Sequence, residues 1–125
     1  TGVDENTAVS LRFPSGAVAA VATSLQTNTP QIAQVLGTAG RIEVHSPWWC
    51  PRRLSVVRSG QAPELIEYPF AGNGFQFEAA HVARCLRDGR LESEILPHDD
   101  TLAVLRTLDT ARAQIGLTYP TESRS

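Results

Sequence analysis

The sequence predicts an α+β fold, in which an open, mostly antiparallel sheet of about six strands carries two helices on one face. Three observations lead to this prediction. The first two-thirds of the chain contain short segments with the apolar alternation of strands. Short turns join these segments, whereas parallel neighbours would need long crossovers. The last third changes to the apolar spacing of amphipathic helices.

Six segments have the character of strands, and turn residues separate them. Pro14-Ser15-Gly16 and Ser59-Gly60-Gln61 are typical hairpin turns, because Gly, Pro and Ser favour turn geometry. Gly37 and Gly40 bracket a tight return between the third and fourth segments. The predicted strands are residues 7–13, 17–26, 32–36, 41–45, 53–58 and 64–68.

Two helices are expected in the last third. The first opens after Gly74 and ends before Gly89, which stands where a C-cap glycine belongs. The second runs to Ile115, with Asp99 and Asp100 as N-cap and first-turn carboxylates. Residues 121–125 have nothing to pack against and are expected to fray. The apolar stripes expected to be buried are Phe75, Ala79, Val82, Ala83 and Leu86, and then Val104, Leu105, Leu108, Ala111 and Ile115.

Composition excludes several classes of function. The formal net charge is −2, so there is no bulk electrostatic case for binding nucleic acid or an anionic membrane. The sequence has no apolar run near the ~20 residues of a membrane-spanning helix. All 11 basic residues are arginine, which excludes mechanisms that need a lysine of this chain. Cys50 and Cys85 are too few for a disulfide framework; free thiols in a reducing cytoplasm are favoured over a single bridge.

Three motifs have a chemical and a structural interpretation. Gly72-Asn73-Gly74 resembles part of a dinucleotide finger, but Phe77 stands at the third glycine position, so a strand-to-helix turn is favoured. Asp99-Asp100 is better explained by helix capping than by acid–base catalysis. Glu78, His81 and Cys85 are metal-ligand types on one helix. The other candidate donors, His45 and Cys50, lie in a distant loop, so no metal site is expected.

The Trp48-Trp49 pair is the strongest sign of a binding site. Pro47 and Pro51 flank the two indoles and stiffen a loop at the end of the predicted sheet. Exposed neighbouring tryptophans usually mark an apolar binding surface. The alternative is that one indole plugs the open end of the sheet. Phe75, at another junction, is expected to face the same cleft.

Several predicted strands carry apolar residues on both sides, where a sheet with one solvated face would alternate more cleanly with charge. The sequence therefore predicts association, most simply as a homodimer, through the sheet face opposite the helices. The residues assigned to this interface are Ala19, Val21, Leu25, Ala33, Val35 and Val57.

Segments spread along the chain resemble the glucose-fructose oxidoreductase / inositol dehydrogenase / MocA family. They are Thr1-Gly2-Val3-Asp4, Trp49-Cys50-Pro51, the run from Phe77 to Leu86, Glu92-Ser93 and the run from Ile115 to Pro120. The resemblance implies that residues 1–120 form a C-terminal substrate-binding and oligomerisation domain. In that family an N-terminal Rossmann domain holds NAD or NADP, and the C-terminal sheet domain completes the substrate pocket and carries the subunit interface.

The resemblance also limits what this chain is expected to do alone. The family's glycine-rich fingerprint and its lysine have no counterpart here, and its acid–base Tyr or His lies upstream of the segment that matches Thr1, so no residue is assigned to catalysis or cofactor binding. Trp49 matches the tryptophan of the family's Trp-Cys-Pro loop, which implies a place in the substrate wall; Trp48 and Phe75 match less closely. The implied function is hydride transfer between NAD(P) and a diol, sugar or related alcohol. The alternative is a stand-alone sheet module for interaction or dimerisation, without an enzymatic role.

Overall fold

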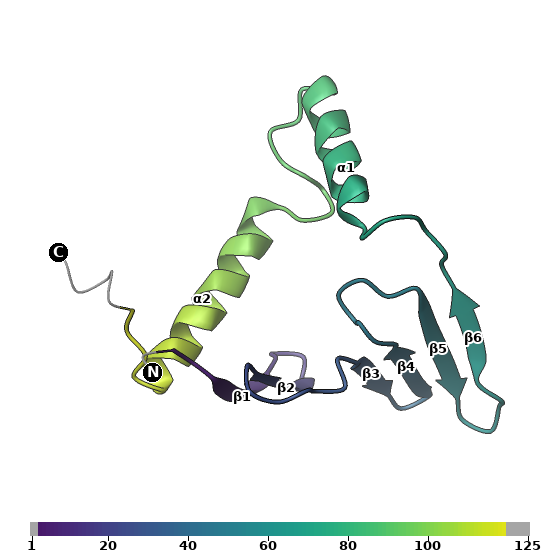
Figure 1. The fold of residues 1–125 in the computed structure, drawn as a ribbon, viewed down its shortest axis with the longest axis horizontal. Helices are drawn as coiled ribbons and strands as arrows, with labels where there is room; N and C mark the ends of the chain where they lie inside the picture. The colour runs from purple at the N-terminus through teal and green to yellow at the C-terminus, as the bar shows by residue number, and fades with distance from the viewer. Residues whose placement is uncertain (1–2, 120–125) are drawn as a thin grey trace. The chain divides into compact units, whose positions relative to one another are not determined.

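The computed structural model describes residues 3–119, which form six strands and two helices and so confirm an α+β fold (Figure 1). The predicted tail, residues 121–125, lies outside the described residues. Two compact units are present: residues 3–29 with 92–119, and residues 30–91. The elements are β1 (Asn6–Arg12), β2 (Val18–Ser24), β3 (Ala33–Gly37), β4 (Gly40–Val44), β5 (Arg53–Arg58), β6 (Glu64–Glu67), α1 (Phe75–Arg87) and α2 (His98–Gln114).

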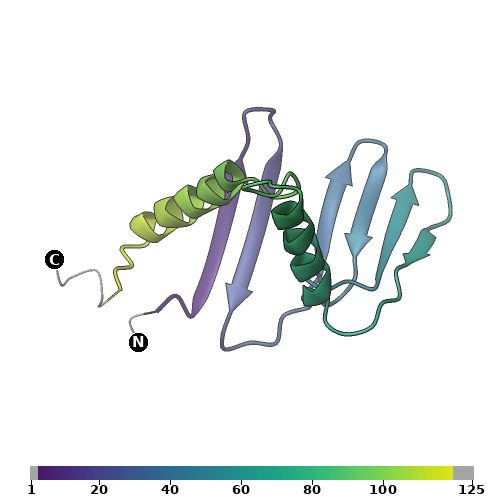
Figure 2. The same ribbon diagram turned by 90° about the horizontal axis from the view of Figure 1, so that it is seen from above.

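The described strands belong to two antiparallel sheets and not to the single sheet that the sequence suggested. The first unit contains the β1-β2 hairpin, and the second contains a four-stranded meander in the order β3-β4-β5-β6 (Figure 2). Between β2 and β3, Pro30 has no N–H to donate and Gln31 adopts a left-handed φ of 54°. These two residues interrupt the extended chain, and no ladder joins β2 to β3 among the described residues.

The register of the four-stranded sheet places most of its apolar residues on one face, which we call the apolar face, because side chains directly opposite each other share a face. Ala33 pairs with Val44, Val35 with Ile42, and Val44 with Leu54. The apolar face carries seven apolar residues and, at its end, the Arg58–Glu64 ion pair, with a nitrogen–oxygen distance of 2.8 Å. The apolar residues are Ala33, Val35, Ile42, Val44, Leu54, Val56 and Ile66. The other face holds the Arg41–Glu43 ion pair, with a nitrogen–oxygen distance of 2.6 Å. This other face also carries Leu36, Val57 and Leu65. Apolar side chains therefore lie on both faces of this sheet, as expected, but they are concentrated on one.

The helix termini follow backbone geometry. Gly74, at φ 97°, is the N-cap of α1, and Gly89, at φ 68°, follows its C-cap as expected. α2 begins after Pro97, which has extended backbone angles and makes no side-chain cap. Asp99 and Asp100 thus lie in the first turn, which corrects the N-cap assignment. Their carboxylates still face the positive end of the helix dipole.

The expected apolar stripes of both helices are largely exposed. Phe75, Val82 and Leu86 of α1 are exposed, as are Val104 and Leu105 of α2. Cys85, at 5% exposure, is the one buried hydrophobic side chain in residues 3–119. The expectation that these stripes are buried is therefore wrong for this chain, because an apolar helix face is buried only where another element covers it. Within the described residues, neither helix has the length and apolar character needed to cross a bilayer.

Candidate functional site

The loop between β4 and β5, residues 45–52, presents both tryptophans to solvent. We call it the aromatic loop. The backbone N–H of Cys50 donates to the carbonyl of Pro47 at 3.0 Å, which closes a turn around the two indoles. The rings of Trp48 and Trp49 meet edge to face, with centroids 6.0 Å apart and planes at 85°. They are 52% and 60% exposed, so neither indole plugs the end of the sheet in this chain.

The aromatic loop is fixed on its β3 side by a hydrogen bond to a strained residue. The backbone N–H of Trp48 donates to the carbonyl of Gln31 at 3.0 Å. Gln31 is the one described non-glycine residue with positive φ, a conformation that costs of order 1–3 kcal/mol. At the base of the loop, His45 Nε2 and Ser55 Oγ are 2.8 Å apart and partly buried. These contacts restrict the end of β4 from which the tryptophans project.

On its other side, the aromatic loop is joined to the chain that leads into α1. Cys50 Sγ donates to the carbonyl of Asn73 at 3.0 Å, and Arg52 Nη2 donates to the carbonyl of Gly72 at 3.1 Å. The guanidinium of Arg52 also lies 5.0 Å from the ring centroid of Phe70. Phe70 in turn packs edge to face on Phe77 of α1, with centroids 5.5 Å apart. These contacts connect the tryptophan loop to the start of the helix.

Phe75 occupies the first position of α1, two residues after the carbonyl that accepts the Cys50 thiol. Its ring is 71% exposed and belongs to neither of the two ring pairs found in residues 3–119. The structure therefore brings the segments of Trp49 and Phe75 close together through their backbones. A common cleft formed by their rings stays a prediction.

A hollow of about 550 Å³ lies beside the aromatic loop, and two arginines and one glutamate are among the residues that line it. Its lining residues are Ser46, Pro47, Cys50, Arg52, Arg53, Glu67 and Pro69, which do not include the three aromatic residues predicted from the sequence. Sequence reasoning missed Cys50 and Arg52 as parts of this site. The Trp49-Cys50-Pro51 match and the adjacent Arg52 and Arg53 are the signals that the sequence offers, and neither reveals which carbonyls Cys50 and Arg52 contact.

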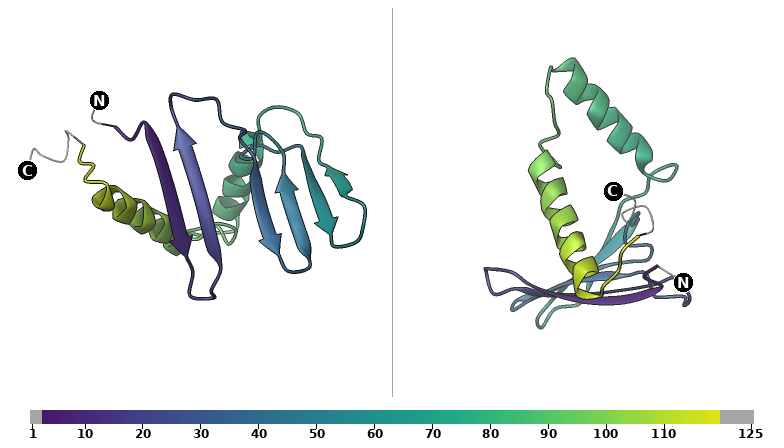
Figure 3. Two further views of the ribbon diagram at one scale, coloured as in Figure 1. Left: turned by 90° about the horizontal axis from the view of Figure 1, so that it is seen from below. Right: turned by 90° about the vertical axis from the view of Figure 1, so that its left-hand side faces the viewer.

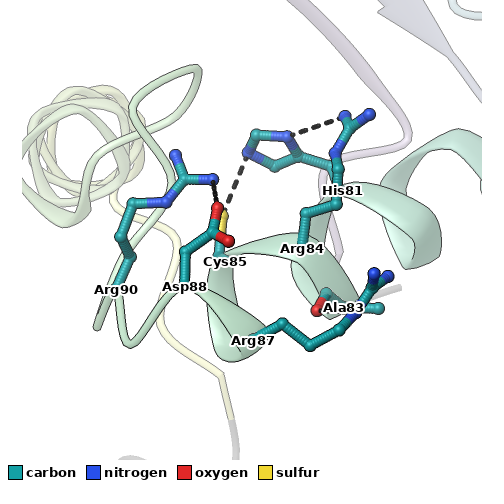
Figure 4. Close-up of polar contacts among 7 residues, drawn as sticks. All are labelled: His81, Ala83, Arg84, Cys85, Arg87, Asp88 and Arg90. Atoms are coloured by element: carbon teal, nitrogen blue, oxygen red, sulfur yellow. Dashed lines mark hydrogen bonds and ion pairs between the residues drawn. The ribbon is translucent and has the colours of Figure 1, made fainter.

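A second polar cluster lies on α1 (Figure 4). His81 Nε2 is 3.4 Å from Cys85 Sγ, and His81 Nδ1 is 3.4 Å from Arg84 Nη2. Near the end of the helix, Arg90 forms an ion pair with Asp88 at 2.9 Å. His81 and Cys85 are two donors at helical spacing, whereas a structural zinc ion takes four ligands. The absence of a metal site stays a prediction.

The residues assigned to the interface fall on different surfaces. In the β1-β2 hairpin, seen in Figure 3, Ala19 and Val21 pair with Leu11 and Val9 on one face. Leu25, which is exposed, follows the end of β2.

In the four-stranded sheet, Ala33 and Val35 lie on the apolar face, whereas Val57 pairs with Arg41 on the other face. The register thus separates Val57 from Ala33 and Val35. A place for any of these residues in an interface stays a prediction.

The chain is similar to curated dehydrogenases over nearly its whole length. D-xylose 1-dehydrogenase (NADP(+)) of Hypocrea jecorina is 33% identical, with 96% of this chain and 34% of the relative covered. Trans-1,2-dihydrobenzene-1,2-diol dehydrogenase is 32% identical in Homo sapiens and 34% in Mus musculus; each alignment covers 99% of this chain. No family model matches the chain.

The chain spans between a third and two-fifths of the length of these relatives. Because the similarity covers almost every residue of the chain, including the segments that carried the resemblance, it is not a short motif match. The chain therefore belongs to the glucose-fructose oxidoreductase / inositol dehydrogenase / MocA family.

Proposed function

We propose that residues 1–120 are the C-terminal substrate-binding and oligomerisation domain of an NAD(P)-dependent oxidoreductase. Its reaction is hydride transfer between NAD(P) and a diol, a sugar or a related alcohol. One observation carries the proposal: relatives named as sugar and dihydrodiol dehydrogenases align with 96–99% of the chain, which spans only 34–39% of their length. The remaining length of such a protein is sufficient for a separate nucleotide-binding domain.

The aromatic loop supports a role in binding the substrate. Trp48 and Trp49 offer exposed, rigid rings on a stiff loop, and Phe75 stands at the adjoining start of α1. Aromatic faces suit the C–H faces of sugar and diol rings, while the nearby hollow offers Arg52, Arg53 and Glu67 for hydroxyl groups. We assign Trp49, Trp48 and Phe75 to the substrate wall.

The cofactor and the catalytic acid–base group are assigned to an N-terminal Rossmann domain. The Gly72-Asn73-Gly74 turn of this chain lacks the third glycine of a dinucleotide finger, and Gly74 approaches Cys50 and Phe70. We therefore assign no residue of this chain to NAD(P). The free thiols of Cys50 and Cys85 are compatible with a reducing cytoplasm, where we place the protein.

The test uses the full-length protein encoded by the gene that contains this chain. Purified protein is incubated with NAD⁺ or NADP⁺ and with D-xylose, other sugars or a trans-dihydrodiol, and formation of the reduced nicotinamide is followed by absorbance. The Trp49→Ala variant should raise KM by about tenfold with little change in kcat, because it removes one ring contact of about 1.4 kcal/mol. Arg87→Gln is the control, since Arg87 donates to the carbonyl of Ala83 within its own helix.

Absence of nicotinamide reduction with every sugar and diol would contradict the proposed activity. A gene that begins just before Thr1, without an upstream nucleotide-binding domain, would favour the alternative of a stand-alone interaction module. The exposed apolar sheet face is the feature of this chain that suits that alternative.

We further propose that the apolar face of the four-stranded sheet packs on a second copy of the chain. Val35 on the edge strand β3 and Ile42 on the neighbouring β4 are exposed, and a face of this composition is unfavourable in water. A two-fold pairing covers the same face on both copies at once, so it leaves no further site for growth.

A further inference from the structure

Cys50 and Arg52 project from the aromatic loop to adjacent carbonyls of one short segment. We call residues 71–74, which precede α1, the pre-helix loop. The Cys50 thiol donates to Asn73 O at 3.0 Å, and the Arg52 guanidinium donates to Gly72 O at 3.1 Å. These partners are 23 and 20 residues apart in sequence, so both bonds fix long-range geometry.

The accepting carbonyls are themselves held in place. Gln76 donates from Nε2 to Ala71 O at 2.6 Å, and its Oε1 accepts from the N–H of Gly74 at 3.1 Å. Asn73 Oδ1 accepts from the N–H of Phe75 at 3.3 Å. Local hydrogen bonds therefore hold the pre-helix loop in place, and its carbonyls are fixed acceptors for Cys50 and Arg52.

The approach of the two loops is close. A Cβ atom added to Gly74 would lie 3.7 Å from Cys50 Sγ and 3.9 Å from a ring carbon of Phe70. Gly74 has a φ of 97°, a conformation that other residues rarely adopt. On the other side of the aromatic loop, the backbone N–H of Trp48 donates to the carbonyl of Gln31, the residue with positive φ. The tryptophans are thus held between two anchors.

We propose that Cys50 and Arg52 are positioning residues that hold the aromatic loop against the pre-helix loop and so set the separation of Trp49 from Phe75. Cys50 does this through its thiol donor. Arg52 does it through its donor to Gly72 and its stacking on Phe70. The effect on substrate affinity rests on the proposed function, whereas the effect on loop geometry does not.

Loop geometry is tested on the 125-residue chain, whose two tryptophans both lie in the aromatic loop. Cys50→Ala and Arg52→Ala should increase acrylamide quenching by up to about twofold and shift emission to longer wavelength, since the indoles become more mobile. Cys50→Ser keeps a donor and should restore quenching to nearly that of the unchanged chain. Cys85→Ala and Arg87→Gln are matched controls: they remove a thiol, or a guanidinium that donates to a backbone carbonyl within α1.

Circular dichroism identifies any variant that fails to fold, and Arg52→Gln, which keeps a shorter donor, then replaces Arg52→Ala. Unchanged quenching in folded Cys50→Ala and Arg52→Ala would overturn the proposal. Equal increases in the two control variants would also overturn it, because the effect would then reflect general loosening.

The consequence for the reaction is measured in the full-length enzyme. Cys50→Ala should raise KM for the alcohol about fivefold with kcat nearly unchanged, since one hydrogen bond of about 1 kcal/mol is lost. Cys50→Ser should recover most of this loss. Increased quenching with an unchanged KM would support the positioning role of Cys50 and contradict the assignment of the tryptophans to the substrate wall.

Discussion

Replacing Val35 with arginine tests the proposed interface on β3, the edge strand of the apolar face. Val35 pairs with Ile42, and Ile42 in turn pairs with Val56, so the new guanidinium would stand among apolar neighbours of adjacent strands. Val35 is 64% exposed in the single chain. The four-stranded sheet should therefore accept the larger side chain without repacking, and the substitution should act on association.

The expected loss of dimer stability follows from the exposure of Val35. Full burial of a valine side chain stabilises by about 1.5 kcal/mol, so covering the exposed part of Val35 contributes about 1 kcal/mol in each copy. A two-fold interface contains the residue twice, so losing both contributions weakens the dimer by about 2 kcal/mol, or about 30-fold. Desolvating two unpaired guanidinium groups adds several kcal/mol for each ion. Together these terms should make Val35→Arg monomeric at tens of micromolar.

Sedimentation equilibrium distinguishes the 13.5 kDa monomer from the dimer. Leu36→Arg is the matched control, because Leu36 is the next residue, is 72% exposed and lies on the opposite face. It should leave the dimer intact. If the unchanged chain is monomeric at tens of micromolar, the proposal that this face forms a dimer interface is refuted. Dissociation by Leu36→Arg but not by Val35→Arg would assign the interface to the face that carries Val57.

Three further predictions concern the hairpin, the cofactor and a strained glycine. Val21→Arg should weaken association and leave the circular dichroism spectrum unchanged if the β1-β2 face that also carries Ala19 joins the interface; an unaltered dimer would remove that hairpin from it. Calorimetric titration of the 125-residue chain with NADPH or NADH should give no micromolar binding, because the chain lacks the glycine fingerprint; saturable micromolar heat would contradict our assignment of the cofactor. Gly40→Ala should lower stability by about 3 kcal/mol or more, since its Cβ would overlap the carbonyl of Val57 at a φ of 153°. Gly60→Ala, where a Cβ meets nothing within 4 Å, should cost only about 1 kcal/mol, and equal losses in thermal denaturation would contradict the reasoning.

The exposed tryptophan loop could be predicted because its causes are local. Pro47 and Pro51 restrict the backbone around two adjacent indoles, and both rings are exposed as that pattern suggests. The partners of Cys50 and Arg52 could not be predicted in the same way. Their acceptors are backbone carbonyls, which every residue carries, so no residue type in the sequence marks Gly72 and Asn73 as partners.

The sequence by itself determined the kinds and order of the elements and the family of the chain. Alternation, helical spacing and turn residues act over a few neighbours, so they can be read without knowing the rest of the fold. The tertiary structure alone decided the division into two sheets. It also decided that Val57 and Ala33 lie on different faces of one sheet. Sheet faces depend on pairing register, and shifting a strand by one residue moves every side chain to the other face. That register is set by contacts between distant segments, which no local pattern records.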